Sequence, residues 1–308
     1  MTAGTTALPP AGEIQPNNPG KRWLSPLTLT GLLFPALLFM ALFFVLPAIS
    51  LFTSSVMTQG QQGQIGLPFT LAHFQRFFET PLYSRVLVTT LRVSLVTACI
   101  ATVIAYPVAS VMVRSSPRVA RVITLVIIAP LVVSVVVRSY GWQLILANGP
   151  NGILNWLLLK AGIIGEPLAL LYAEIAVVIG SLHVFFPMMV LPLASSLAKI
   201  NPAIEEAACT LGATTWQTFR RVTLPLSTPG LAAGFTLVFS LTAGSFVTPA
   251  LLGGNSTQVL GILIEQQILA VYDWPFGSAI AVILVCVVMG INLLSLWLLE
   301  GRRKGVSA

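Results

Sequence analysis

The sequence predicts an all-α membrane protein with six transmembrane helices. Of its 308 residues, 56% are hydrophobic and only 8% are charged, whereas soluble domains contain about 25% charged residues. The apolar residues form long blocks without Asp, Glu, Lys or Arg, at 93–113, 175–198, 222–264 and 274–299. A spanning helix needs roughly 20 such residues. Because backbone hydrogen bonds in lipid must close within a segment, a helical bundle follows.

Six spans are predicted along the chain, separated by polar or turn-rich stretches. Residues 53–83 are mixed and polar, so they predict an exposed loop, and a tight basic turn follows at 114–118. Residues 139–167 contain Trp142, Trp156 and turn-forming residues at 148–152, which favour an interfacial stretch over a span. The spans are therefore expected at about 27–52, 84–113, 119–137, 168–192, 226–252 and 275–299.

The distribution of basic residues predicts the orientation of the chain. Eleven Lys and Arg residues fall in the two termini, the 114–121 turn and the 193–225 loop, against four on the opposite face. The positive-inside rule then places both termini in the cytoplasm. We expect a disordered cytoplasmic tail at 1–23, a transmembrane domain at 24–300 and a basic cytoplasmic tail at 301–308. The first apolar run is too long for a cleavable signal peptide.

Several other classes of protein find no support in the sequence. The net charge of +7 lies at segment ends rather than on a basic face with interleaved aromatic residues, so no nucleic-acid partner is expected. Cys99, Cys209 and Cys286 lie far apart, and only two histidines are present. We therefore expect buried free thiols, no disulfide and no metal site.

The polar loop at 193–225 predicts a structured element between two spans. Asn201 can cap a helix whose first residue is Pro202. Glu205 and Glu206 then lie near the positive end of the helix dipole, and Gly212 can end the helix in a left-handed conformation. A second short helix is expected to start at Thr214 or Thr215.

This loop resembles the EAA loop found in permease subunits of bacterial ABC importers. The spacing fits EAA-x3-G-x9-I-x-LP, with Val222 where isoleucine is usual. Segments 138–142, 151–155, 186–192 and 244–254 look like the spermidine/putrescine branch of that family, on its first-permease side. Many members carry an acid after the glycine of the last segment, where this chain has Ser245.

The resemblance implies a type I importer fold and a set of partners. These are a second, different permease subunit, two copies of a cytoplasmic ABC ATPase and a periplasmic solute-binding protein. The residues implied to couple to the ATPase are Glu205, Glu206, Ala207, Ala208, Leu211, Gly212, Val222, Leu224 and Pro225. The chain has no phosphate loop of the Gly-x4-Gly-Lys-Ser/Thr type, so we expect ATP and Mg²⁺ to be bound by the ATPase. We therefore expect no cofactor in this chain and no enzyme activity of its own.

Polar and aromatic residues within spans are candidates for the substrate pathway, because such groups are costly in lipid. The candidates are Tyr140, Trp142, Glu174, His183, Ser240, Thr242, Ser245, Phe246 and Thr248. Four of them also have a structural explanation: interface anchoring for Tyr140 and Trp142, a solvated carboxylate for Glu174, and helix–helix hydrogen bonding for His183. The other five surround an interruption of the fifth span that Gly244, Ser245 and Pro249 predict, and a broken backbone at membrane depth is tolerated where it lines a cavity. Arg92 is expected to extend outward to the interface, and Gly230 and Gly234 are expected to permit close helix packing.

The predicted function is that of a permease subunit in an ATP-driven, binding-protein-dependent importer. Its solute is expected to be a polyamine or a related amine or amino-acid derivative. The alternative is a secondary transporter or channel that acts without an ATPase. That alternative requires ion-coupling acids within the membrane, and only Glu174 approaches this description. A membrane-embedded enzyme is disfavoured because no cluster of catalytic residue types is evident.

Overall fold

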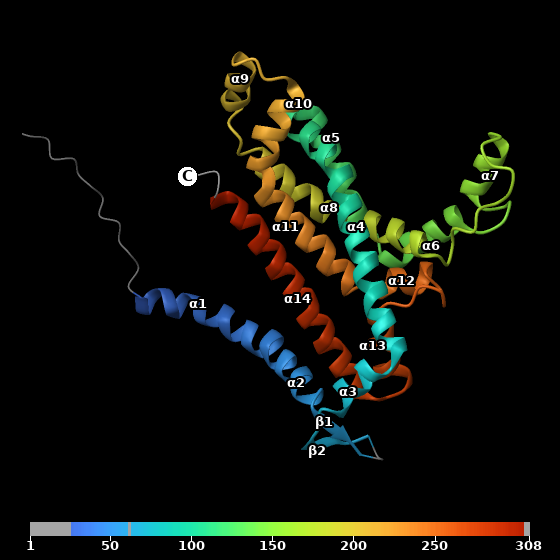
Figure 1. Ribbon diagram of the computed structural model, residues 1–308. Coiled ribbons are helices and arrows are strands. Elements are labelled where there is room, and N and C mark those ends of the chain that lie inside the picture. Colours follow the sequence, from blue (N-terminus) through green and yellow to red (C-terminus); the bar gives the residue numbers. More distant parts are fainter. Residues whose placement is uncertain (1–25, 61–62, 305–308) are drawn as a thin grey trace, which may run out of the picture. The chain divides into compact units, whose positions relative to one another are not determined.

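A computed structural model describes residues 26–60 and 63–304, and most of them are helical (Figure 1). The chain divides into two compact units, Met1–Ile49 and Ser50–Ala308. The predicted tail at 1–23 lies outside the described residues. Helix α1 (Pro26–Met40), the π-helical turn η1 (Ala41–Val45) and α2 (Leu46–Ser54) follow one another without a break. All side chains from 33 to 47 are exposed, as in a helix whose surroundings are apolar.

The second unit begins with a small hairpin that was not predicted. Strands β1 (Met57–Gln59) and β2 (Ile65–Phe69) pair antiparallel, and α3 (Ala72–Glu79) follows them. The Gln59 side chain donates to the carbonyl of Tyr272 at 2.7 Å and accepts from the amide of Trp274 at 3.1 Å. Residues 53–60 and 63–83 therefore contain regular structure and are not a simple loop. The second predicted span forms as α4 (Pro81–Arg114).

The third predicted span, 119–137, is wrong as a single helix. Helix α5 (Pro117–Val132) ends early, and α6 (Val135–Leu146) leaves it at an angle of 102°. Pro130 lacks an amide hydrogen and crowds the preceding turn, and Val133 and Ser134 are extended, with ψ of 137° and 138°. The expected interfacial stretch thus contains most of α6 and all of α7 (Ile153–Lys160).

The fourth span begins later than predicted, because residues 168–173 are not helical. Tyr172 has a φ of 66°, which interrupts the chain. Asn155 and Asn148 hold this segment by pairing with the backbone of Leu168 and Leu171. The span itself is α8 (Glu174–Leu197).

The 193–225 loop and the next span follow α8. They comprise α9 (Pro202–Thr210), α10 (Thr215–Thr218), the π-helical turn η2 (Phe219–Thr223), α11 (Leu224–Ala243) and α12 (Val247–Leu252). The predicted fifth span, 226–252, is broken at 244–246, where the sequence predicts an interruption at Gly244 and Ser245. The break occurs at Gly244, where the low helix propensity of glycine favours an end.

The last elements are α13 (Leu260–Glu265), the π-helical turn η3 (Gln266–Ala270) and α14 (Trp274–Lys304). Helix α14 contains the sixth predicted span and continues through 301–304 of the predicted basic tail, whose remaining residues lie outside the described part. Among the described helices, five are long and apolar enough to cross a membrane, or six if α5 and α6 form one broken span.

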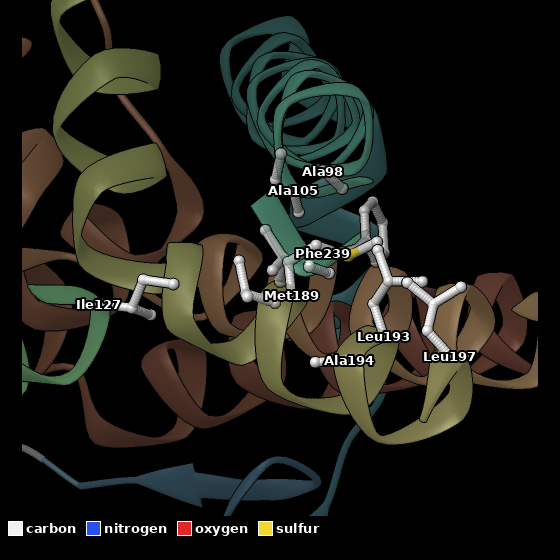
Figure 2. Close-up of a cluster of buried hydrophobic side chains, with 12 residues drawn as sticks. Ala98, Ala105, Ile127, Met189, Leu193, Ala194, Leu197 and Phe239 are labelled. Carbon is white, nitrogen blue, oxygen red and sulfur yellow. The ribbon is translucent and has the colours of Figure 1, made fainter. Parts of the chain in front are cut away.

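The core of the second unit lies where α4, α8 and α11 pack against one another. Ala98, Ala101, Ala105 and Ala109 form a buried stripe of small side chains on α4. Figure 2 shows this cluster, in which Met189 and Leu193 of α8 and Phe239 of α11 lie near the alanines. Small residues let helix backbones approach closely, which is how helices gain packing energy in lipid.

Gly230 and Gly234 make the contact between α8 and α11 closer still. A Cβ atom at Gly230 would lie 2.4 Å from Cβ of Ser196, and one at Gly234 would lie 2.6 Å from the sulfur of Met189. The predicted role of these glycines in close helix packing is confirmed.

Candidate functional site

The candidate coupling site is a two-helix loop with well-defined ends. The side chain of Asn201 accepts a hydrogen bond from the amide of Ala203 at 3.1 Å, and Pro202 begins α9, as predicted. Gly212 has a φ of +86°, the left-handed conformation predicted for the end of this helix. Thr214 and Gln217 then form a reciprocal capping box at the start of α10. These caps satisfy the helix ends locally, so the loop holds its shape.

Glu205 and Glu206 have different environments. One carboxylate oxygen of Glu205 accepts from the guanidinium of Arg114 and from the hydroxyl of Thr223, each at 2.5 Å. Glu205 therefore ties α9 to the end of α4 and to η2. Glu206 is exposed on the surface of α9. The resemblance grouped the two acids together, whereas in the structure Glu205 is engaged within the chain and Glu206 faces outward.

Large apolar side chains are exposed on this loop. Leu211, Trp216 and Ile204 are 89%, 66% and 47% exposed. Of the other predicted coupling residues, Ala207 and Pro225 are exposed, whereas Ala208, Val222 and Leu224 are half-buried. Exposed apolar groups beside a free carboxylate are typical of a surface that binds another protein.

A line of aromatic contacts connects this surface to the bundle. Trp216 stacks on Phe219 with ring centroids 5.3 Å apart, and Phe219 meets the edge of Tyr106 at 5.0 Å. The hydroxyl of Tyr106 hydrogen-bonds Ser227 at 2.9 Å. These contacts connect the loop to α4 and α11.

Two of the predicted pathway residues lie together. The indole nitrogen of Trp142 on α6 donates to Nδ1 of His183 on α8 at 3.0 Å. This bond gives His183 the helix–helix role that was one of its two predicted explanations. Tyr140, two residues before Trp142, is 54% exposed.

Glu174 lies apart from this pair, at the first residue of α8. It forms an ion pair with Arg92 of α4, and both side chains are partly exposed. Glu174 and His183 are nine residues apart, which is about 13 Å along a helix. Arg92 was expected to extend outward to the interface, and in the structure its partly exposed side chain is paired with Glu174.

The remaining candidates surround the break between α11 and α12. The hydroxyl of Ser245 donates to the carbonyl of Thr242 at 3.1 Å, and the hydroxyl of Ser240 accepts from Asn292 at 2.7 Å. Thr242 and Thr248 are buried, whereas Phe246 is 45% exposed. The break thus presents Phe246 outward and turns its threonines into the bundle.

Several groups in these networks were not singled out from the sequence. Asn292 is a polar residue within an apolar block, and that signal alone could have identified it. Arg114, Thr223 and Tyr106 carried no such signal, because their partners lie far away in the sequence.

The cysteines differ from the prediction. All three are exposed, so the expectation of buried thiols is wrong. Cys99 and Cys286 lie on faces of α4 and α14 that this chain does not cover. Within 26–60 and 63–304, no group of three or more His, Cys, Asp or Glu residues is arranged to hold a metal ion.

Comparison with known proteins places the fold and the loop in a family. Residues 101–301 match the family described as "Binding-protein-dependent transport system inner membrane component". The chain is 34% identical over 258 residues to the spermidine/putrescine transport system permease protein PotB of Escherichia coli, covering 84% of this chain and 92% of that protein. It is 36% identical over 242 residues to PotB of Haemophilus influenzae, covering 78% and 84%.

Solved structures show the same fold at lower sequence identity. A bacterial ABC transporter involved in the import of the acidic polysaccharide alginate matches with a TM-score of 0.72 at 19% identity, covering 88% of this chain and 94% of that one. The MetNI methionine ABC transporter matches with a TM-score of 0.53, also at 19% identity. The chain is therefore a multi-pass protein of the bacterial inner membrane, and it belongs to the family of binding-protein-dependent transport system inner membrane components.

Proposed function

We propose that this chain is one of two different permease subunits in an ATP-driven importer of polyamines of the spermidine or putrescine type. Two cytoplasmic ABC ATPases bind ATP and Mg²⁺ and drive the transport cycle. A periplasmic binding protein delivers the solute at the end of the bundle that carries the β1–β2 hairpin. In this orientation α9 and α10 lie in the cytoplasm, in agreement with the distribution of basic residues.

The geometry of the α9–α10 loop is the observation that carries this proposal. The loop is capped at both helix starts, exposes Glu206, Leu211 and Trp216, and is fastened to α4 through Glu205. A rigid, apolar, outward-facing loop fastened to spanning helices is what an ATPase needs in order to move them. A transporter working alone has no use for such a surface.

The polyamine assignment rests on the 34–36% identity to PotB proteins over most of the chain. Polyamines carry several positive charges, so their pathway requires carboxylates or aromatic faces. In the described bundle Glu174 is paired with Arg92, and Ser245 stands where related permeases often carry an acid. We infer that this chain contributes aromatic surface, and that the second permease and the binding protein contribute most of the carboxylates.

The assembly can be tested by purifying the tagged chain from its native cells. We expect to recover an ATPase and a second permease with wild type, and to find the ATPase lost or uncoupled with Glu206→Lys or Gly212→Pro. Glu79→Lys is a suitable control, since Glu79 ends α3, outside the loop. If the wild-type chain purifies alone and transports solute into liposomes without ATP, the secondary-transporter alternative replaces the proposal.

The solute can be tested separately with the complete complex in proteoliposomes. We expect ATP-dependent uptake of radiolabelled spermidine or putrescine when the binding protein is added. Unlabelled polyamines should compete for uptake, whereas neutral amino acids should not. ATP-dependent uptake that is blocked by an amino-acid derivative, and not by polyamines, would keep the importer mechanism and reject the polyamine assignment.

A further inference from the structure

Arg138 on α6 is a charged side chain that has no hydrogen-bond partner at two of its nitrogen atoms within residues 26–60 and 63–304. Its Nε and Nη1 atoms are buried and make no hydrogen bond within the part of the chain that the structure describes. The ion pairs formed there are Arg76–Asp273, Arg92–Glu174 and Arg114–Glu205, so no described carboxylate lies within 4.0 Å of Arg138.

A guanidinium group with buried, unpaired nitrogen atoms needs a hydrogen-bond acceptor. The guanidinium group stays protonated under all physiological conditions, and burying an unpaired charge carries a large desolvation penalty. Its planar, forked set of donors matches a carboxylate better than any neutral acceptor, because both oxygens can be engaged at once. The acceptor is therefore expected to be a carboxylate other than those of the described residues.

The faces of α6 indicate the direction from which that carboxylate arrives. Trp142 bonds to His183, and Gln143 donates to the carbonyl of Leu251 at 2.6 Å, so one face of α6 is fastened to α8 and α12. Val137, Tyr140 and Leu144, which follow helical spacing on α6, are 62%, 54% and 67% exposed. Arg138 precedes Trp142 by one helical turn, so it lies at the border between the fastened face and this exposed face. An apolar face that bears a tyrosine and is bordered by an unpaired arginine is typical of a protein interface.

We propose that a carboxylate of the second permease subunit pairs with Arg138, and that Val137, Tyr140 and Leu144 pack against that subunit. This inference rests on the proposed function, because it requires a second permease. A polyamine carries no carboxylate and cannot be the acceptor. Neutralising Arg138 from the partner also removes a positive charge that would otherwise repel a polycation within the membrane.

The pair can be trapped by chemical cross-linking in the native complex. In Arg138→Lys, a membrane-permeant carbodiimide activates a contacting carboxylate, the lysine amine attacks it to form an amide bond, and the carbodiimide leaves as its urea. We expect a covalent adduct of the two permeases that mass spectrometry assigns to the lysine introduced at position 138 and one Asp or Glu of the partner. Arg138→Gln should give no adduct. Arg92→Lys is the matched positive control, because it should link to Glu174 within this chain.

A second measurement separates an interface role from other roles of Arg138. Truncating one member of a buried charge pair weakens binding considerably, so Arg138→Gln should lower recovery of the second permease by roughly tenfold or more. Arg85→Gln, which changes a basic residue of α4, should leave recovery unchanged.

The possible outcomes have distinct meanings. If wild type contains no second permease, the proposed function fails and the inference fails with it. If the second permease is present and the Arg92→Lys control links to Glu174, the inference is overturned when Arg138→Lys links to nothing and Arg138→Gln assembles normally. Normal assembly with an altered KM for spermidine uptake, or bound lipid phosphate at Arg138, would likewise overturn it.

Discussion

Glu205 and Glu206 are neighbours in α9, but only Glu205 is paired within the chain. Successive residues in a helix point about 100° apart. That rotation turns Glu205 toward Arg114 and Thr223 and leaves Glu206 on the surface. The sequence could place both acids in the first turn of a helix. It could not predict which acid is paired. The partner, Arg114, lies 91 residues away in the sequence and comes close to Glu205 only because α4 packs beside the loop.

Replacing Glu205 with alanine should destabilise the loop, because two hydrogen bonds to one carboxylate are lost. Arg114 is 54% exposed, so the expected loss is limited to about 1 kcal/mol. The apparent Tm in detergent should fall for Glu205→Ala and stay constant for Glu206→Ala. In the complex, Glu205→Ala should retain ATP hydrolysis but reduce solute uptake per ATP. Equal effects of the two variants would contradict the fastening role of Glu205.

The Ser240–Asn292 bond allows a second prediction. The carbonyl oxygen of Asn292 is buried without a described partner, and its amide nitrogen bonds only to Ser240. Ser240→Ala leaves that amide unsatisfied as well and should cost about 1 kcal/mol. Adding Asn292→Leu removes the unsatisfied groups, so the double variant should recover the lost Tm. A double variant less stable than Ser240→Ala would show that Asn292 has other partners.

Helices in this bundle are interrupted where length and hydropathy alone predict continuity. The 119–137 and 226–252 blocks are long enough to span, but α5 ends at Val132, two residues after Pro130, and α11 ends at Ala243, before Gly244. The interruption at Gly244 and Ser245 was predicted from the sequence. The break after Pro130 was not, because proline is tolerated in spanning helices when neighbours satisfy the backbone.

The close contact of α8 and α11 makes Gly230 sensitive to a single methyl group. Gly230→Ala would place Cβ 2.4 Å from Ser196 and 2.7 Å from the carbonyl of Pro192, and such overpacking costs about 2 kcal/mol. Gly290 has open space around it, so Gly290→Ala should be neutral or stabilising by up to about 1 kcal/mol. Thermal unfolding of both variants in detergent checks this contrast. An unchanged Tm for Gly230→Ala would mean that α8 and α11 are less closely packed.

For the molecule as a whole, the apolar blocks predicted the order of the spans and the place of the polar loop. The polar segments contained elements that the sequence did not indicate. The β1–β2 hairpin rests on the start of α14 through Gln59, which is more than 200 residues away. Such contacts depend on how the spans pack, and no local pattern encodes them.

The exposed Cys209 provides a test of the orientation of the whole protein. In inside-out vesicles a membrane-impermeant maleimide should label Cys209, because α9 is proposed to lie in the cytoplasm. In right-side-out vesicles labelling should be absent, and Cys209→Ser should remain unlabelled in both. Addition of the ATPase should protect Cys209. Labelling from the outside would reverse the proposed topology.

The two ion pairs of α4 have a consequence for the lipids around the protein. Arg92 and Arg114 bind Glu174 and Glu205 at positions 22 residues apart, or about 33 Å along the helix. That distance is close to the hydrocarbon thickness of a bilayer, about 30 Å. In a bilayer several ångströms thicker, one pair must enter hydrocarbon or α4 must change its tilt. The transport rate should therefore depend on the acyl chain length of the lipids. It should be highest where the hydrocarbon thickness of the bilayer matches the distance between the two ion pairs of α4.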